Sequence, residues 1–314
     1  MDVLSVIFSI LPLFLIMLLG VFVRKVGIFD WQTTKRIASF IVNITQPFLI
    51  IASFITERTG DKLKTALGII VASLVMHVAF SVFAAVIFRK SDVADRSTLE
   101  FGLIFGNCAY LGYPVLMAVF PQNGLFYGAA FTLVFNVYIR TYGVFLLNKG
   151  KKNGHAVLKA IVNPGTIASV IGILLFAFNV QPPAFLTSTF TTVGNLTFPL
   201  SMIVVGSLLC NKTAKNLFSA KVFLFSMARL FALPVITLVI CLLCRVDTGM
   251  TMLCVIMASM PTAANTAIFC ELYKANSPLA ASCVGVSSLL SVFTIPIILW
   301  LTKFATTLFN GPWT

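Results

Sequence analysis

Residues 43–47 read Asn-Ile-Thr-Gln-Pro, and residues 195–199 read Asn-Leu-Thr-Phe-Pro. The two stretches share the pattern Asn-x-Thr-x-Pro and lie 152 positions apart. The same ungapped offset makes further residues coincide: Pro12 with Pro164, Gly20 with Gly172, and His77 with Arg229. Proline, asparagine and glycine are uncommon in apolar sequence, so these matches indicate an internal repeat rather than chance. We therefore predict two related halves, residues 1–152 and residues 153–314.

The chain of 314 residues is dominated by apolar side chains. Hydrophobic residues make up 59% of it and charged residues 10%, against about 45–50% and about 25% in soluble domains. The 22 Lys+Arg and 9 Asp+Glu give a formal charge of +13. A soluble nucleic-acid-binding protein would carry such a charge on a generally polar surface, and a disordered chain would be far less apolar. The composition therefore predicts a polytopic membrane protein.

We predict an all-α protein with ten membrane-spanning helices, because ten stretches each hold about 20 mostly apolar residues. These stretches are residues 4–23, 37–56, 65–88, 100–119, 124–147, 160–178, 186–210, 220–244, 249–271 and 279–303. Each half of the repeat then contains five spans. With an odd number of spans, the second half enters the membrane from the opposite side. Inverted repeats of this kind are common in secondary transporters, where the substrate site lies near the membrane midplane.

Basic residues in the loops predict the orientation. Asp2 precedes the first span, and Arg24 and Lys25 follow it, which is the wrong polarity for a cleaved signal peptide. If the N-terminus lies outside, the inner loops hold 15 basic residues and the outer loops with the C-terminal end hold 5. The inner ones are Arg24, Lys25, Lys35, Arg36, Arg89, Lys90, Arg96, Lys149, Lys151, Lys152, Lys159, Lys212, Lys215, Lys221 and Lys274. The positive-inside rule therefore predicts both termini outside the plasma or inner membrane.

The repeated Asn-x-Thr-x-Pro pattern predicts a local opening in two spans. Proline unpairs the carbonyl four residues earlier, and in both copies that carbonyl belongs to the asparagine itself. An asparagine in hydrocarbon needs a hydrogen-bond partner, and the freed carbonyl is a candidate. We expect Asn43, Pro47, Asn195 and Pro199 to shape a substrate cavity. The alternative is a kink whose polar groups are satisfied by neighbouring helices.

Spans four and nine are the least helix-like. Residues 105–114 read Phe-Gly-Asn-Cys-Ala-Tyr-Leu-Gly-Tyr-Pro, and residues 260–266 read Met-Pro-Thr-Ala-Ala-Asn-Thr. Broken helices at membrane depth are tolerated where they line a cavity or are buried in protein, and the N-terminal ends of half-helices attract anions. We predict that Asn107 and Asn265 donate to a substrate carboxylate where the two breaks cross. The other candidate contacts at the breaks are Cys108, Tyr110, Pro261 and Thr262.

These motifs resemble those of the auxin efflux carrier family, which includes plant PIN auxin carriers and bacterial permeases for small organic acids. Residues 107–114 look like the PIN pattern Asn-x4-Gly-x-Pro, and residues 261–296 look like the last two helices of the family. The resemblance covers essentially the whole chain, without the long central loop of many plant members. Gly106 stands where plant carriers have proline, and Asn265-Thr266 replaces their second proline in span nine. Both departures argue against auxin itself as the substrate.

The resemblance implies that the spans form two structural parts. Spans 1, 2, 6 and 7 would form a scaffold, and spans 3–5 and 8–10 a mobile transport domain. Spans four and nine would cross at their broken segments, where asparagine side chains hold the carboxylate of the substrate. By residue matching, Asn107 and Pro261 carry over from the family pattern.

Ionisable residues inside the predicted spans are functional candidates. Arg140 and Arg229 either attract an anionic substrate or pair with freed carbonyls as structural residues. His77 either relays a proton or is a neutral ring bonded to a carbonyl. Glu271 sits at a span end, where we expect it to pair with Lys274. No aspartate lies within a span, which weakens any coupling to protons or sodium and argues against prenyl-transfer enzymes that need clustered aspartates for magnesium.

The sequence therefore predicts a carrier rather than an enzyme. It would move a small organic anion, such as a mono- or dicarboxylate or an auxin-like acid, by alternating access and in the direction of efflux. The alternatives are a sodium-coupled symporter of the bile-acid type and a membrane sensor that binds a ligand without moving it. The seven cysteines lie in or at the ends of apolar stretches, so we expect no metal and no cofactor. The expected partners are the organic anion and the lipid bilayer, with no nucleic acid, and a homodimer is left open.

Overall fold

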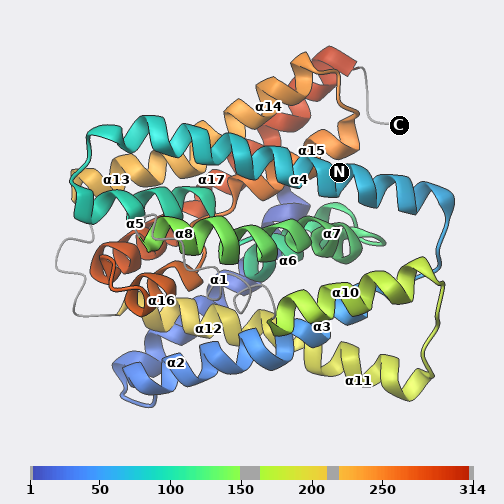
Figure 1. Ribbon diagram of the computed structural model, residues 1–314, viewed down its shortest axis with the longest axis horizontal. Coiled ribbons are helices and arrows are strands. Elements are labelled where there is room, and N and C mark those ends of the chain that lie inside the picture. Colours follow the sequence, from blue (N-terminus) through green and yellow to red (C-terminus); the bar gives the residue numbers. More distant parts are fainter. Residues whose placement is uncertain (1–2, 149–162, 211–218, 311–314) are drawn as a thin grey trace.

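The computed structural model describes residues 3–148, 163–210 and 219–310, which form a bundle of helices (Figure 1). In these ranges there is no β-strand, and one isolated antiparallel bridge joins Gly106 to Thr262. The helices are α1 (Val3–Lys25), α2 (Trp31–Phe40), η1 (Ile41–Thr45), α3 (Gln46–Phe54), α4 (Gly60–Ile87), η2 (Phe88–Lys90), α5 (Val93–Ile104), η3 (Cys108–Gly112), α6 (Tyr113–Val119), α7 (Gly124–Tyr138), η4 (Ile139–Gly143), α8 (Val144–Leu147), α10 (Pro164–Ala177), α11 (Ala184–Asn195), α12 (Thr197–Leu209), α13 (Ala220–Met227), η5 (Ala228–Ala232), α14 (Leu233–Leu243), α15 (Thr248–Ser259), α16 (Asn265–Leu272) and α17 (Ser277–Asn310).

Six helices in the described ranges are long and apolar enough to cross a membrane, judged by length and composition. They are Trp31–Phe54, Gly60–Lys90, Gly124–Leu147, Ala184–Leu209, Ala220–Leu243 and Ser277–Phe309. Three shorter apolar helices cover Cys108–Val119, Pro164–Ala177 and Thr248–Ser259. All ten predicted stretches contain helix where they are described, but the start of the sixth, residues 160–162, lies outside the described residues. That all ten cross the membrane, as an inverted repeat, stays a prediction.

Short polar segments start the helices. Side chains at helix N-termini accept hydrogen bonds from backbone N–H groups that would otherwise lack partners. These capping side chains are Asp30, which accepts from the Thr33 N–H, Thr59 from Lys62, Asn163 from Thr166, Ser219 from Val222, and Asp247 from Met250. Some consecutive helices pack against each other, as α4 does with α5 and α14 with α15, whereas α1 packs most extensively against α12.

In the described ranges, four helical turns widen to π-helical geometry, and three of them precede a proline. The turns η1, η3 and η5 lead into helices that carry Pro47, Pro114 and Pro234 in their first turn. Proline cannot donate to the carbonyl four residues earlier, and a wider turn accommodates the unpaired group. The fourth turn, η4, contains Arg140, and η5 contains Arg229. Both intramembrane arginines therefore lie on irregular turns.

Helices α1 and α12 approach each other backbone to backbone. A Cβ atom on Gly20 would lie 2.3 Å from the Ile203 carbonyl oxygen, and one on Gly206 would lie 1.9 Å from the Met17 carbonyl oxygen. No side chain fits either contact. Glycines at helix interfaces permit the close packing that replaces the hydrophobic driving force within lipid.

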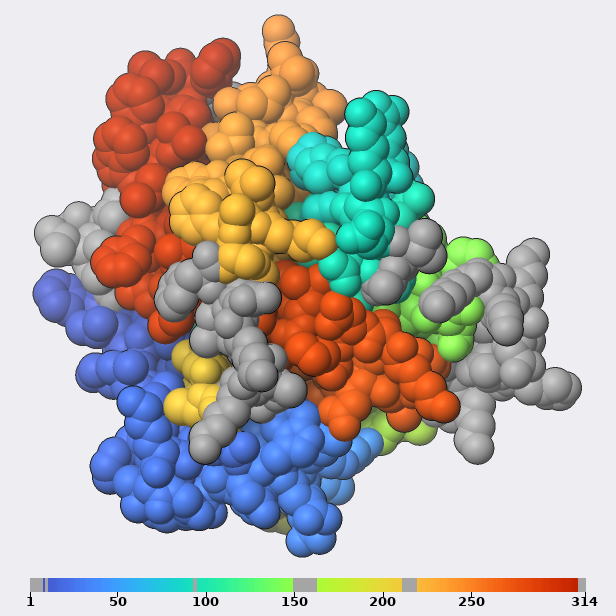
Figure 2. Space-filling model, turned by 90° about the vertical axis from the view of Figure 1, so that its left-hand side faces the viewer, coloured from blue at the N-terminus to red at the C-terminus, as the bar shows by residue number. Residues whose placement is uncertain are grey.

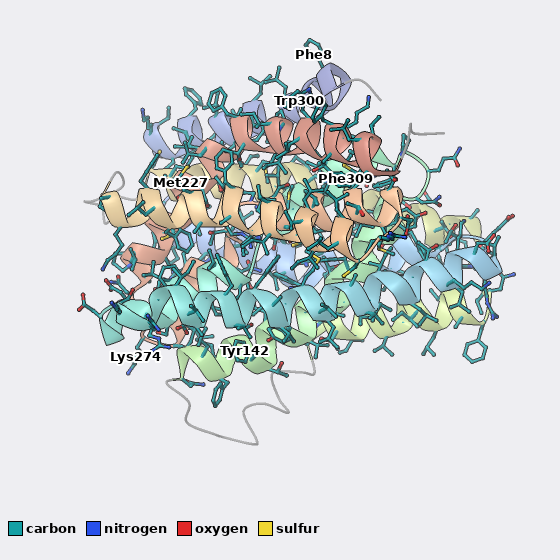
Figure 3. The ribbon with its side chains drawn as sticks, turned by 90° about the horizontal axis from the view of Figure 1, so that it is seen from above. Phe8, Tyr142, Met227, Lys274, Trp300 and Phe309 are labelled. Atoms are coloured by element: carbon teal, nitrogen blue, oxygen red, sulfur yellow. The ribbon has the colours of Figure 1, made fainter. Side chains whose placement is uncertain are left out.

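The outer surface of the bundle is apolar, and its two ends differ. Phe8, Trp300 and Phe309 are 66%, 54% and 73% exposed and project from the bundle (Figure 3). Phe8 and Phe309 lie toward one end of the helices, whereas Lys274 lies toward the opposite end (Figure 3). The first part of α1 and the last part of α17 therefore lie toward the same side of the bundle. Of the basic residues assigned above to the inner loops, Lys149, Lys151, Lys152, Lys159, Lys212 and Lys215 lie outside the described residues.

Candidate functional site

The two predicted helix breaks are present, and they contact each other. Helix α5 ends before η3, and α15 ends before α16. The Asn107 N–H donates to the Pro261 carbonyl at 2.7 Å, and the Ala263 N–H donates to the Phe105 carbonyl at 3.0 Å. These paired bonds form the isolated bridge between the two breaks. Backbone groups freed by each break are thus satisfied by the other, as burial within a membrane protein requires.

Arg229 donates hydrogen bonds to both helices that end at this crossing. Its side chain is 1% exposed, its Nε donates to the Met260 carbonyl at 2.9 Å, and its Nη1 donates to the Leu103 carbonyl at 2.7 Å. These carbonyls lie at the C-terminal ends of α15 and α5, where a cation is favoured by the helix dipoles. Arg229 therefore matches the structural alternative of the sequence prediction, pairing with freed carbonyls.

His77 is also buried beside the crossing. Its Nδ1 donates to the Ser73 carbonyl at 2.6 Å, and the rings of Phe105, Phe131 and Tyr138 pack around it. The carbonyl can only accept, so this bond places the proton on Nδ1. The contacts correspond to the second alternative for His77, a ring bonded to a carbonyl.

A cavity of about 590 Å³ lies next to the crossing. Its walls come from α2 with the following turn η1, from α7 with η4, from the start of α10, and from α16. The polar and charged residues of the lining are Lys35, Ser39, Asn43, Gln46, Asn136, Arg140, Asn163, Asn265 and Glu271. Most of these side chains donate hydrogen bonds, which suits an anionic ligand.

The cavity lining contains three charged residues, and two of them pair with each other. Lys35 of α2 forms an ion pair with Glu271 of α16, and both side chains are 39% exposed. The predicted pairing of Glu271 with Lys274 is wrong, because the end of α16 faces α2. In Figure 2, α2 (blue) lies beside α16 and the start of α17 (orange-red) on this end of the molecule. Arg140 is half-buried, and no described carboxylate lies within ion-pair distance of its guanidinium.

Tyr110 connects the crossing to the cavity. Its hydroxyl donates to the Gln46 side-chain oxygen at 3.4 Å and interacts with the Asn265 side chain. Asn107 is buried, and its side-chain oxygen accepts from the Tyr110 N–H at 3.3 Å. Movement at the crossing would therefore reach the cavity wall through Tyr110.

The structure brings four of the predicted site residues to this cavity, namely Asn43, Asn265, Arg140 and Glu271. Four others, Asn107, Cys108, Pro261 and Thr262, are buried at the crossing. Pro47 is buried in α3, and Asn195 and Pro199 lie on α11 and α12, outside the described lining. The expected partner of Asn43 is wrong, because its Nδ2 donates to the Ser39 carbonyl at 2.8 Å. Asn43 lies in the π-helical turn η1, and its side-chain amide is directed at the preceding helical turn rather than at the Asn43 carbonyl.

Sequence reasoning missed several lining residues, and some carried a signal. Asn163 directly precedes Pro164, and asparagine before proline is typical of a helix start. Asn136 lies four positions before Arg140 and thus on the same helix face. Lys35 had been assigned only to the basic inner face. Lys35 and Glu271 are separated by 236 residues in the sequence, so no local sequence pattern could have predicted their pairing.

The chain is similar in sequence to a family of membrane transport proteins and to several transporters. A family model described as membrane transport protein, which represents the auxin efflux carrier family, matches residues 5–157 and 153–299. The uncharacterized transporter YfdV of Escherichia coli (strain K12) is 24% identical over 310 residues, covering 94% of this chain and 97% of that protein. The uncharacterized transporter MJ1031 of Methanocaldococcus jannaschii is 22% identical over 308 residues, covering 93% and 97%. An uncharacterized transporter of Methanothermobacter thermautotrophicus is 23% identical over 296 residues, covering 92% and 96%.

Proposed function

The chain belongs to the membrane transport protein family of auxin efflux carriers, and from this premise we propose that it is a secondary carrier for a small organic anion. It is an integral membrane protein, as the family and the apolar helices show. In this proposal it exports a mono- or dicarboxylate or an auxin-like acid across the plasma or inner membrane by alternating access. The chemistry is binding and release rather than covalent catalysis.

The observation that carries the anion assignment is Arg140 in the cavity wall, which forms no ion pair with any described carboxylate. Since Lys35 and Glu271 neutralise each other, Arg140 supplies the remaining charge among the described lining residues. A half-buried cation without a carboxylate attracts an anion more strongly than an exposed one, because less water screens it. The amide groups of Asn265 and Asn43 lie in the same lining and can donate to the anion.

The proposed architecture is the inverted repeat of two five-span halves, residues 1–152 and 153–314, with both termini outside. One contact supports it: the Thr197 hydroxyl donates to the Thr45 hydroxyl at 2.9 Å, and the two residues are separated by the repeat offset of 152. Equivalent residues touch where a pseudo-two-fold axis passes between two copies. The cavity walls also agree with a scaffold and a mobile domain. Spans two and six, from the proposed scaffold, form one side, and spans five and nine, from the proposed mobile domain, form the other.

The direct test is transport by the purified protein in liposomes. Radiolabelled lactate, succinate and indole-3-acetate represent the three substrate classes, and each is loaded inside vesicles to follow its exit. Saturable flux of at least one acid is expected. Flux that needs sodium would favour the bile-acid type of symporter, and saturable binding without any flux would favour a sensor. The absence of both flux and binding for all three acids would contradict the proposal.

We expect Arg140→Gln to weaken the interaction with the anion while leaving the fold intact. A hydrogen bond to a charged group contributes about 1.5–3 kcal/mol, so KM should rise on the order of tenfold to a hundredfold. The matched control is Arg140→Lys, which keeps the charge. A KM for Arg140→Gln equal to that of the unmodified protein, measured with the acid that shows flux, would remove Arg140 from the site.

A further inference from the structure

A second group of donors lies in the cavity wall, one helical turn from Arg140. Asn136 is 7% exposed, and its Nδ2 has no hydrogen-bond partner in the described part of the chain. A buried amide that donates to nothing is destabilising, and native proteins rarely keep one unless water, an ion or a ligand completes it. Since Asn136 belongs to the cavity lining, a ligand there can supply the missing acceptor.

The group beside Asn136 is the N-terminus of α10. A Cβ atom on Gly165 would lie 3.6 Å from the Asn136 Nδ2, so the amide points at the first turn of this 14-residue helix. Within that turn, Pro164 has no N–H. The Thr166 N–H donates to the Asn163 side chain at 3.1 Å, and the Ile167 N–H donates to the Asn163 carbonyl at 2.9 Å. In the described part of the chain, the first-turn N–H that remains for a ligand is therefore that of Gly165.

We propose that the Asn136 amide and the Gly165 N–H form a subsite that binds a carboxylate. This inference rests on the proposed function, because the carboxylate would be that of the transported anion. Two converging donors match the two oxygens of a planar carboxylate, and the positive end of the α10 dipole favours its charge. Glu271, the acidic residue of the described lining, is already paired with Lys35.

The subsite also accounts for the glycine at position 165. A Cβ atom there would lie 3.3 Å from the Asn163 side-chain oxygen and point toward the Asn136 amide. An alanine would be tolerated by the helix but would occupy the space that an anion needs. Gly165→Ala thus blocks the subsite without removing any hydrogen-bonding group.

The test measures binding of acetate, the simplest carboxylate, through the shift in melting temperature of the purified full-length protein. Sodium acetate is compared with sodium chloride at equal ionic strength, and a bound ligand raises the melting temperature. The unmodified protein should be stabilised, and Asn136→Leu and Gly165→Ala should each lose most of the shift. The control is Thr294→Val, which removes another buried unpartnered polar group from α17, away from the cavity, and should keep the full shift.

Two results would overturn the subsite. One is the absence of an acetate-specific shift in the unmodified protein, and the other is a shift in Asn136→Leu and in Gly165→Ala as large as that of the unmodified protein. If Asn136→Leu does not fold, Gly165→Ala decides alone. Liposome flux separates this inference from the proposed function. Flux that is insensitive to both variants keeps the carrier and removes the subsite. Acetate stabilisation that depends on Asn136 in a protein without flux keeps the subsite and removes the carrier.

Discussion

Glycine at position 106 and arginine at position 229 depend on each other. A Cβ atom on Gly106 would lie 1.8 Å from the Arg229 Nη2, which is closer than any non-bonded contact allows. The guanidinium can reach the carbonyls of Leu103 and Met260 only because residue 106 has no side chain. Glycine in place of the plant proline at position 106 therefore has a local explanation, because only glycine leaves room for the Arg229 guanidinium at the crossing.

We expect Gly106→Ala to destabilise the protein by displacing Arg229. Each buried carbonyl left without its donor costs about 1–3 kcal/mol, so the melting temperature should fall by at least a few degrees. Gly60→Ala is the matched control, because a Cβ atom on Gly60 meets nothing within 4 Å. Equal melting temperatures for the two variants, measured in the same detergent, would show that Arg229 does not hold the crossing.

The different roles of the two arginines could not be predicted from the sequence. Arg140 and Arg229 look alike in the sequence, since each is a lone cation in an apolar span. The structure separates them, because the carbonyls that pair with Arg229 lie 31 and 126 residues away in the chain. Among the residues that the structure describes, Arg140 has no such partners, and it lines the cavity. Which carbonyls a break frees can be predicted locally, but which side chain reaches them depends on tertiary packing.

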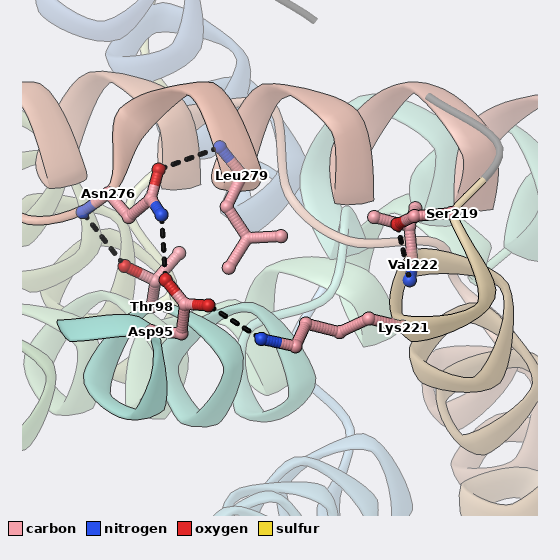
Figure 4. A network of polar contacts seen from close by, with 7 residues as sticks. All are labelled: Asp95, Thr98, Ser219, Lys221, Val222, Asn276 and Leu279. Atoms are coloured by element: carbon pink, nitrogen blue, oxygen red, sulfur yellow. Dashed lines mark hydrogen bonds and ion pairs between the residues drawn. The ribbon is translucent and has the colours of Figure 1, made fainter. Parts of the chain in front are cut away.

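At the level of elements, three helix starts are joined by one polar network (Figure 4). Asp95 at the start of α5 accepts from Lys221 of α13 at 2.7 Å and from the Asn276 side chain at 2.7 Å. The Asn276 N–H, just before α17, donates to Thr98 at 3.2 Å. The hydrogen bond from Lys221 lowers the pKa of Asp95, against the opposing effect of its partial burial, and Asn276 adds to the lowering.

This network predicts a loss of stability in acid. A carboxyl whose pKa is lower in the folded than in the unfolded state stabilises the fold above its unfolded pKa of about 3.9. That contribution disappears as the pH falls through the lower, folded pKa. Because Lys221 is 44% exposed, we expect the pair to contribute no more than about 1 kcal/mol. The protection of amide groups from hydrogen exchange at the starts of α5 and α17, measured relative to the intrinsic exchange rate at each pH, should therefore fall below about pH 4.

Asp95→Asn is the control for this acid effect. It keeps the shape of the side chain but cannot titrate, so the protection from exchange at these helix starts should already be lower at neutral pH and should change less in acid. The same acid response in Asp95→Asn and in the unmodified protein would assign the effect to other carboxylates.

Helix breaks were predictable, whereas wide helical turns were predicted only in part. Gly106, Asn107 and Pro261 disfavour regular helix through their own backbone chemistry, so the sequence alone located both breaks. The opening before Pro47 was expected, but not its π-helical form or the bond from Asn43 to Ser39. The turn η4 precedes no proline, and no local signal marked it.

For the whole molecule, the arrangement of the two ends predicts the membrane topology. Phe8 and Phe309 lie toward one end, and Lys274 lies toward the other (Figure 3). Because the basic loops were assigned to the inner face, we expect both termini outside. A C-terminal alkaline phosphatase fusion should be active in bacterial cells, and a C-terminal green fluorescent protein fusion should be dark. A bright green fluorescent fusion would reverse the orientation.

The ion pair between Lys35 and Glu271 ties the two proposed parts of the molecule together at the cavity. Lys35 lies on α2, in the proposed scaffold, and Glu271 lies on α16, in the proposed mobile domain. Both line the cavity, so any motion that widens the gap between α2 and α16 must break the pair. An exposed pair contributes only up to about 1 kcal/mol, which makes it suited to opening and closing repeatedly.

Charge reversal tests this link between cavity walls. Lys35→Glu and Glu271→Lys each place like charges together, so each should favour separation of α2 from α16 and lower the flux of the transported acid several-fold. The double variant restores opposite charges in reversed positions and should recover most of the flux. Because Arg140 is retained in all three proteins, the attraction for the anion changes least in the double variant. Flux in the double variant no higher than in the weaker single variant would mean that the pair is incidental to transport.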